Sequence, residues 1–225
     1  MEHSKQRDDK QVTKNPPYKF SNRYYFAEVY DVLEKLAESV ARPGMIGVDI
    51  GCLDGSSAWS MLPVVKREDG TAYLVDWFRG SPDTVVGADW RMDNFPTGEV
   101  IFNLLENLRT DGFDKMTLVV AALSDRAATV VADGAVDYCF IAADHRYTQA
   151  RRDIVAWAPK IRPGGVIAGH AFETRVESGT EDWQTMMNNC EQDLVNNAHY
   201  GVIRAVQECF DSFEVDAGVW WTRKL

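Results

Sequence analysis

The stretch VDIGCLDGSS, residues 48–57, decides the fold that we predict. It joins the end of an apolar run, MIGVDI (45–50), to a tight loop that carries Gly51 and Gly55. The residues that follow, SSAWSMLPVV (56–65), are typical of the start of a helix. A buried strand that passes through a glycine loop into a helix is the repeating unit of an α/β sheet. The first turn of such a helix directs its unpaired N–H groups at the loop.

The same alternation of strand and helix continues along the chain. Further strands are predicted at residues 71–76, 116–121, 136–142 and 164–170. Further helices are predicted at residues 99–112, 147–161 and 200–210. The last two apolar runs, FEVDA and VWWTR, meet at Ala217-Gly218, a turn too short for a crossover, so they must be antiparallel. We therefore predict a doubly wound, mostly parallel α/β sheet, covered on both faces and ending in an antiparallel hairpin.

The predicted domain spans residues 21–225. Residues 1–20 are polar, which predicts a flexible tail, and a helix is expected from Ser21 to the stop signal Pro43-Gly44. Residues 173–199 form a long polar excursion between the fifth strand and the last helix. Connections of that length are often lids or substrate-choosing elements, so we predict a single domain with a lid at 173–199.

The composition favours a small-molecule partner. The net charge of -10 disfavours nucleic acid and anionic membranes, because phosphate groups need a basic patch. No apolar run approaches the ~20 residues that span a bilayer, and the charged N-terminus lacks the apolar core of a secretory signal. Four scattered cysteines without a C-x-x-C pair indicate reduced thiols, neither a zinc site nor a disulfide framework. We expect a cytoplasmic protein, and the sequence leaves open whether it is a homo-oligomer.

Ligands of such sheets bind beyond the carboxyl ends of the strands. Gly51 and Gly55 let the backbone approach a ligand, but G-x-x-x-G is not the dinucleotide fingerprint G-x-G-x-x-G, and a plain strand-to-helix turn would also contain it. Asp76 ends the second strand 25 residues after Gly51, where an acid can accept hydrogen bonds from ribose hydroxyls. Asp49 suits a ligand with an ammonium group. Together these residues fit S-adenosylmethionine, a nucleoside that carries an amino acid and no pyrophosphate; a solvated strand-end acid is the alternative for Asp76.

At this point the chain resembles a known family. VDIGCLDGSS is similar to motif I of class I S-adenosylmethionine-dependent methyltransferases. VDYCFIAADHRYTQARRDIVAWAPKIRPGGVIAGHAF, residues 136–172, resembles a more specific pattern. That pattern belongs to small-molecule O-methyltransferases grouped with macrocin-type sugar methyltransferases and cephalosporin-hydroxylase-like proteins. The resemblance covers roughly residues 45–222 and implies the seven-stranded methyltransferase sheet.

The resemblance also implies a set of site residues. The implied cofactor-binding residues are Asp49, Gly51, Cys52, Gly55, Ser56, Asp76, Trp77, Ser124 and Asp144, with Asp125 beside Ser124. The implied catalytic residues are Asp144, His145 and His170, among which Asp144 or a histidine would take the proton of an acceptor hydroxyl. For the histidines the alternative is an ordinary hydrogen-bonded residue at a strand end. Arg151, Arg152 and Asp153 are interpreted as a solvated helix face, and Trp90 as a loop residue that covers a ligand or is simply packed.

The chain departs from the resembling enzymes at their metal site. Their first acid of D-A-D-H and the acid after Gly-His help to bind a divalent metal, but this chain has Ala142 and Ala171 there. Because magnesium needs oxygen ligands that alanine lacks, we predict no metal at that site. Asp144, His145, His170 and Glu173 remain nearby as ligands for a metal in a changed geometry.

Three accounts of these alanines stay open. The chain is a metal-independent methyltransferase, it uses or merely binds the sulfonium cofactor for another purpose, or the alanines silence a metal site, by nature or by engineering. We expect the first: methyl transfer from S-adenosylmethionine to a hydroxyl of a small molecule, such as a sugar or a secondary metabolite. A dehydrogenase is a distant alternative, because the dinucleotide fingerprint is missing.

Overall fold

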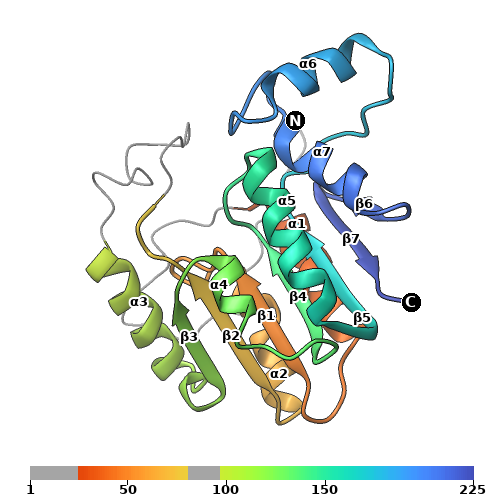
Figure 1. The fold of residues 1–225 in the computed structure, drawn as a ribbon. Coiled ribbons are helices and arrows are strands. Elements are labelled where there is room, and N and C mark those ends of the chain that lie inside the picture. Colours follow the sequence, from red (N-terminus) through yellow and green to blue (C-terminus); the bar gives the residue numbers. More distant parts are fainter. Residues whose placement is uncertain (1–24, 81–96) are drawn as a thin grey trace, which may run out of the picture.

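The structure is a computed structural model that describes residues 25–80 and 97–225. In that part of the chain seven strands form one sheet in the order β3-β2-β1-β4-β5-β7-β6 (Figure 1). The strands are β1 (Ile46–Ile50), β2 (Thr71–Asp76), β3 (Thr117–Ala121), β4 (Val136–Ile141), β5 (Ile161–Gly169), β6 (Glu214–Asp216) and β7 (Val219–Arg223). The first five are parallel, and β7 is antiparallel to both β5 and β6. The predicted doubly wound sheet with a terminal hairpin is confirmed.

Helices cover both faces of this sheet. They are α1 (Ala27–Glu38), α2 (Leu62–Arg67), α3 (Thr97–Thr110), α4 (Ser124–Ala128), α5 (Tyr147–Trp157), α6 (Glu181–Asn189) and α7 (Tyr200–Cys209). One apolar cluster joins the sheet to α4, α5 and α7, and the other joins it to α1, α2 and α3. Figure 1 shows α4 and α5 in front of the strands with α1 and α2 behind them. Every residue of β4 is buried, as expected of a central parallel strand with two covered faces.

The predicted helix at 56–65 is wrong in its start. Ser56 and Ser57 lie in a turn, a short 3₁₀ helix follows at Ala58–Ser60, and α2 begins only at Leu62. Pro63 explains the late start, because proline fits only the first turn of a helix. The two serines use their hydroxyls on Tyr30 and Asp49. The N-terminus of an α-helix therefore does not follow the glycine loop directly.

The structure adds one helix that the sequence did not predict and leaves other predictions untested. The five-residue helix α4 was not predicted, because so short a helix leaves no periodic signal. The excursion 173–199 carries helix α6, and nothing in the structure tests its role as a lid. The predicted tail at 1–20 and Trp90 lie outside the described residues.

Candidate active site

A cavity of about 570 Å³ opens at the carboxyl ends of the parallel strands. It lies where the strand order reverses, because β1 pairs with β2 on one side and with β4 on the other. Its wall comes from the loops after β1, β2, β3 and β4, from His170 after β5, and from the excursion 173–199. The volume is within the range of small-molecule sites.

Gly51 and Gly55 have packing reasons for being glycine. Gly51 lines the cavity with φ +79°, and a Cβ on it would lie 2.3 Å from the carbonyl oxygen of Ala142. The missing side chain thus lets the end of β1 touch the end of β4. Gly55 is not among the lining residues, and its missing Cβ makes room for the ring of Trp59 at 2.5 Å.

Asp49 lies just behind the cavity wall. It is buried, and its Oδ2 accepts a 2.6 Å hydrogen bond from the hydroxyl of Ser57, which does line the cavity. Its Oδ1 is buried and has no hydrogen-bond partner among residues 25–80 and 97–225. Burial raises the pKa of Asp49 to about 7, although the Ser57 hydroxyl acts in the opposite direction. Asp49 is therefore a desolvated acid that is separated from the cavity by the side chain of Ser57.

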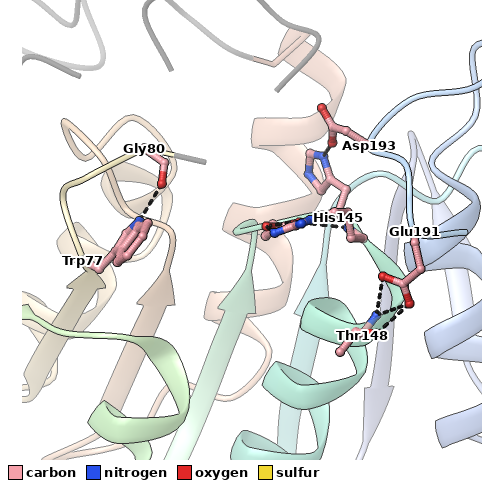
Figure 2. Close-up of polar contacts among 8 residues, drawn as sticks. Trp77, Gly80, His145, Thr148, Glu191 and Asp193 are labelled. Carbon is pink, nitrogen blue, oxygen red and sulfur yellow. Dashed lines mark hydrogen bonds and ion pairs between the residues drawn. The ribbon is translucent and has the colours of Figure 1, made fainter. Parts of the chain in front are cut away.

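Asp76 faces the cavity from the end of β2. Its Oδ1 accepts from the amide of Phe78 at 2.7 Å, and its Oδ2 accepts from the amide of Leu53 at 3.1 Å. These bonds tie together the loops that follow β1 and β2. Burial raises the pKa of Asp76 despite the opposing backbone amides. Beside it, Trp77 lines the cavity and donates from Nε1 to the carbonyl of Gly80 at 2.7 Å (Figure 2).

The α4 and α5 side of the cavity contains a second buried acid. Ser124 lines the space and accepts from Nε1 of Trp157 at 2.9 Å. Asp153 also lines it, and burial raises its pKa to about 7 against the opposing hydrogen bond from Ser124. The interpretation of Asp153 as part of a solvated face is wrong, because the residue is only 6% exposed. Cys52 and Ser56 line the cavity as well, and the Ser56 hydroxyl bonds the hydroxyl of Tyr30 at 2.6 Å.

The polar residues after β4 line the cavity on the β4 and β5 side of β1. Asp144 lines the cavity and is held by Arg146, whose guanidinium contacts both carboxylate oxygens, at 3.0 Å on Oδ1 and 2.6 Å on Oδ2. The Arg146 amide also donates to Oδ1 at 3.0 Å. The carboxylate therefore has a fixed direction, set by its own loop.

Two histidines follow on this wall, each paired with an acid. His145 Nδ1 lies 2.8 Å from Oδ1 of Asp193, as Figure 2 shows. His199 Nδ1 lies 2.5 Å from Oε1 of Glu173, whose Oε2 accepts the His199 amide at 3.0 Å. The two imidazoles pack edge to face with centroids 4.4 Å apart. His145, Asp193 and His199 all line the cavity.

His170 completes the wall in a more apolar setting. Its ring packs on Tyr25 with centroids 4.5 Å apart. Burial, followed by the nearby His145 and His199, lowers the pKa of His170 to about 4. The imidazole is therefore neutral at neutral pH and can act there as a hydrogen-bonding group or a proton acceptor.

The two alanines at the positions of expected acids lie in different surroundings. Ala142 lines the cavity, whereas Ala171 is buried in the apolar cluster beside Phe172. Ala171 also has φ +66°, a backbone conformation that aspartate adopts more readily than alanine. An acid at position 142 would therefore face the cavity, whereas one at position 171 would lie in the apolar core.

The cavity brings together most of the predicted site residues. Those that line it are Gly51, Cys52, Ser56, Asp76, Trp77, Ser124, Asp125, Asp144, His145 and His170, whereas Asp49 and Gly55 stand behind the wall. Sequence reasoning missed Asp193 and His199, which the excursion delivers from 48 and 54 positions beyond His145. Their residue types in a long polar segment were the available signal, but no spacing rule joined them to His145.

The strand order and a cavity at its reversal define a doubly wound α/β protein of the nucleotide-binding type. A family model described as a methyltransferase domain matches residues 48–172, more than half of the chain. The chain belongs to this methyltransferase family. It is accordingly an enzyme of the class that transfers methyl groups from S-adenosylmethionine.

Solved structures share the fold at low sequence identity. A protein from Corynebacterium glutamicum aligns with a TM-score of 0.59 and 14% identity, covering 88% of this chain and 82% of that one. The O-methyltransferase NovP aligns at 0.57 and 15%, covering 88% and 79%. The calicheamicin methyltransferase CalS11 aligns at 0.55 and 13%, covering 87% and 77%. These identities establish the fold alone.

No curated protein matches the sequence at a significant level. Among the helices in residues 25–80 and 97–225, none has the length and apolar character needed to cross a membrane.

Proposed function

We propose that the protein methylates a hydroxyl group of a small molecule, such as a sugar or a secondary metabolite, with S-adenosylmethionine as donor. The observation that carries the proposal is a single cavity with two chemically different walls. One wall presents Asp76 and Ser124, and the facing one presents Asp144, His145 and His170. The first suits a nucleoside, and the second suits an acceptor that must lose a proton.

The cofactor is proposed to occupy the side of β1, β2 and α4. Asp76 accepts from the ribose hydroxyls, and Trp77 covers the nucleoside from the adjoining loop. The base lies beside Ser124 and Asp125. The amino acid end points to Gly51, Cys52 and Ser56, and its ammonium group is stabilised by Asp49 through Ser57. Gly55 supports this loop by its packing on Trp59 and does not touch the cofactor.

The acceptor is proposed to dock against the facing wall. Asp144, oriented by Arg146, accepts a hydrogen bond from the acceptor hydroxyl, and a histidine of the same wall takes its proton. The oxygen then forms a bond to the methyl carbon while the bond from that carbon to sulfur breaks. The products are the methyl ether and S-adenosylhomocysteine. The excursion 173–199 closes this wall as the predicted lid, and the carboxylate metal site of the resembling enzymes has no counterpart at Ala142 and Ala171.

One observation favours a second candidate, a protein that binds the cofactor and transfers no methyl group to a hydroxyl. Both oxygens of Asp144 accept hydrogen bonds from Arg146, so an acceptor hydroxyl would compete with the guanidinium for them. The two candidates differ in turnover and agree in cofactor binding, so that turnover separates them.

The first experiment is calorimetric titration with S-adenosylmethionine, S-adenosylhomocysteine, NAD and NADP in parallel. We expect saturable binding of the first two alone; binding of only the nicotinamide pair would overturn the proposal. A screen of hydroxylated acceptors then follows methyl transfer by mass spectrometry. Asp144→Asn and His145→Ala should each lower turnover by about 10²-fold or more. Asp133→Asn, an exposed acid paired with Lys160, is the control that should leave turnover unchanged.

A further inference from the structure

Three side chains on the acceptor wall have the identity and spacing of a metal site. His145, Asp193 and His199 each offer one ligand atom, and these atoms all lie within 4.8 Å of one another. They come from three separate segments: the loop after β4, the segment after α6 and the residue before α7. Two imidazoles and one carboxylate are the ligand set of open catalytic metal sites.

The distance between two of these ligands fits a shared ion. Nδ1 of His145 and Oδ1 of Asp193 are 2.8 Å apart (Figure 2). Ligands that bind zinc at ~2.0–2.2 Å lie roughly 3 Å from one another, so an ion needs only a small shift of either group. In the absence of metal, a proton between the nitrogen and the carboxylate would hold the pair in place.

The third ligand is already oriented from outside the triad. Glu173 accepts from His199 twice, at Nδ1 and at the backbone amide. A carboxylate on Nδ1 fixes the tautomer in which Nε2 carries the lone pair, which is how outer groups support metal-bound histidines. The support for a ligand is therefore built before any ion arrives.

We propose that His145, Asp193 and His199 bind one divalent transition-metal ion, such as zinc, manganese or iron, at the cavity wall. Two imidazole ligands favour these ions over magnesium, which prefers oxygen. Three protein ligands leave coordination positions open toward the cavity that all three residues line. This site differs from the acidic one lost at Ala142 and Ala171, since it shares no residue with those positions.

The role of the ion rests on the proposed function, whereas its binding does not. A metal at this wall would hold the acceptor oxygen and lower the pKa of its hydroxyl. His145 would then serve as a ligand, and the hydroxyl proton would leave to Asp144, His170 or solvent. The ion would thus supply what the missing acids supply in the resembling enzymes, through a different set of ligands.

The test is a titration of chelator-treated, full-length protein with Co²⁺, followed by its absorption spectrum, and with Zn²⁺, followed by calorimetry. We expect one equivalent to bind, with a spectrum that lacks the thiolate-to-metal charge-transfer band. Four free cysteines are present, so such a band would place the ion elsewhere and overturn the proposal.

Matched variants locate the ligands. Asp193→Asn and His199→Gln should each weaken metal binding by at least about 100-fold, and Glu173→Gln by about 10–100-fold as an outer partner. Glu191→Gln is the control for Asp193→Asn, because Glu191 bonds Thr148 on the far side of that segment (Figure 2). His170→Gln is the control for a histidine of the same wall outside the triad. Both controls should bind the ion as the parent does, and thermal melting curves establish that every variant is folded.

The two proposals fail separately. Stoichiometric metal binding that depends on the triad supports the site even if no acceptor is ever methylated. Methyl transfer that is unchanged by chelation, in a protein that binds no Co²⁺ or Zn²⁺, would overturn the site and leave the methyltransferase proposal intact. Metal affinity that is insensitive to both Asp193→Asn and His199→Gln would also overturn it.

Discussion

A buried aspartate at one end of the parallel sheet has a lowered pKa, and a buried aspartate at the other end has a raised pKa. At the amino end, Asp137 on β4 is fully buried and is paired with Arg42 at 2.5 Å and with Arg162, and the Ile46 amide donates to it as well. Burial would raise the pKa of Asp137, but these hydrogen bonds lower it. At the carboxyl end, Asp49 on β1 has one hydroxyl partner, and burial raises its pKa to about 7.

The difference shows that buried carboxylates without a cationic partner among the described residues lie at the carboxyl end of the sheet, beside the cavity. An acid that serves only structure is expected to be neutralised by cations, as Asp137 is. A buried acid beside a cavity that has no cationic partner in the protein is a candidate for binding a positively charged ligand group. S-adenosylmethionine carries two such groups, a sulfonium and an ammonium. Asp49 and Asp153 both fit this description, and both lie at the end of the sheet where the cavity opens.

The largest expected effect is the contrast between Asp49→Asn and Asp137→Asn. Asp49 has a folded pKa of about 7 against an ordinary value of 3.8, so the unfolded chain loses this proton first as the pH rises. Stability then falls between about pH 4 and 7 and is level above it, by about 4 kcal/mol for this group. Asp49→Asn removes that fall and should raise the free energy of unfolding at pH 8, while weakening S-adenosylmethionine binding. Denaturant unfolding at pH 4.5 and pH 8 measures the change in stability.

The matched variant should have the opposite sign. Asp137 has a lowered folded pKa, so its contribution to stability is present above about pH 4 and is lost as the pH falls through the folded value. Asp137→Asn leaves two arginines without their carboxylate and should destabilise the protein by about 2–3 kcal/mol at pH 8, moderated because Arg42 is half exposed. If both variants destabilise equally at pH 8, the contrast between the two ends is wrong.

The sequence could predict the cavity residues that follow the strand ends, but not those that the excursion 173–199 supplies. Asp49, Asp76 and Asp144 follow directly from strand ends, since parallel strands bring their carboxyl ends to one edge. Asp193 and His199 reach the same cavity through tertiary packing: the carbonyl of Cys190 accepts the Tyr147 amide at 2.8 Å, and α7 packs on the loop that holds His145. No periodicity encodes such contacts. The start of α2 was mispredicted for a local reason, the proline at its first turn.

Gly201→Ala tests the packing that delivers the acceptor wall. Gly201 is the second residue of α7, and a Cβ there would lie 2.2 Å from the carbonyl oxygen of His145 and 2.4 Å from the amide nitrogen of Tyr147. Backbone cannot move aside as a flexible side chain can, so we expect a loss of about 3 kcal/mol in the free energy of unfolding. Gly98→Ala is the matched control, because Gly98 is the second residue of α3 and a Cβ there would meet no atom of the described residues within 4 Å. That change should stabilise the protein slightly, since alanine is the better helix former. Denaturant unfolding of the two variants compares them, and equal losses would show that α7 does not rest on this contact.

Asp76→Asn tests a carboxyl-end acid that backbone amides hold in place. The amide side chain retains one carbonyl oxygen as acceptor and places an NH₂ group toward either Leu53 or Phe78, whose amides are donors themselves. The loss of one charged hydrogen-bond acceptor toward the ribose should weaken S-adenosylhomocysteine binding by about 2 kcal/mol, roughly 30-fold. Asp111→Asn is the control, an acid that accepts from Trp59 at 2.7 Å and is not among the lining residues of the cavity. Calorimetry should find its affinity unchanged. Equal losses in the two variants would argue for a general effect on folding.

Trp77→Phe gives the smallest effect and defines the rim of the cofactor half. The indole Nε1 donates to the carbonyl of Gly80 at 2.7 Å, and this bond fixes the loop after β2 against the cavity. Phenylalanine keeps an aromatic face for the nucleoside but loses the donor, which is worth about 1 kcal/mol. We therefore expect a several-fold weaker affinity for S-adenosylhomocysteine and unchanged metal binding at the triad. Trp77→Ala should weaken the affinity further, because it removes the aromatic surface as well. Calorimetry on both variants separates the two contributions: if Trp77→Phe binds as the parent does while Trp77→Ala does not, the ring and not the loop anchor is what the cofactor uses. If neither variant changes the affinity, the cofactor does not touch this rim, and Trp77 belongs to the packing of its loop alone.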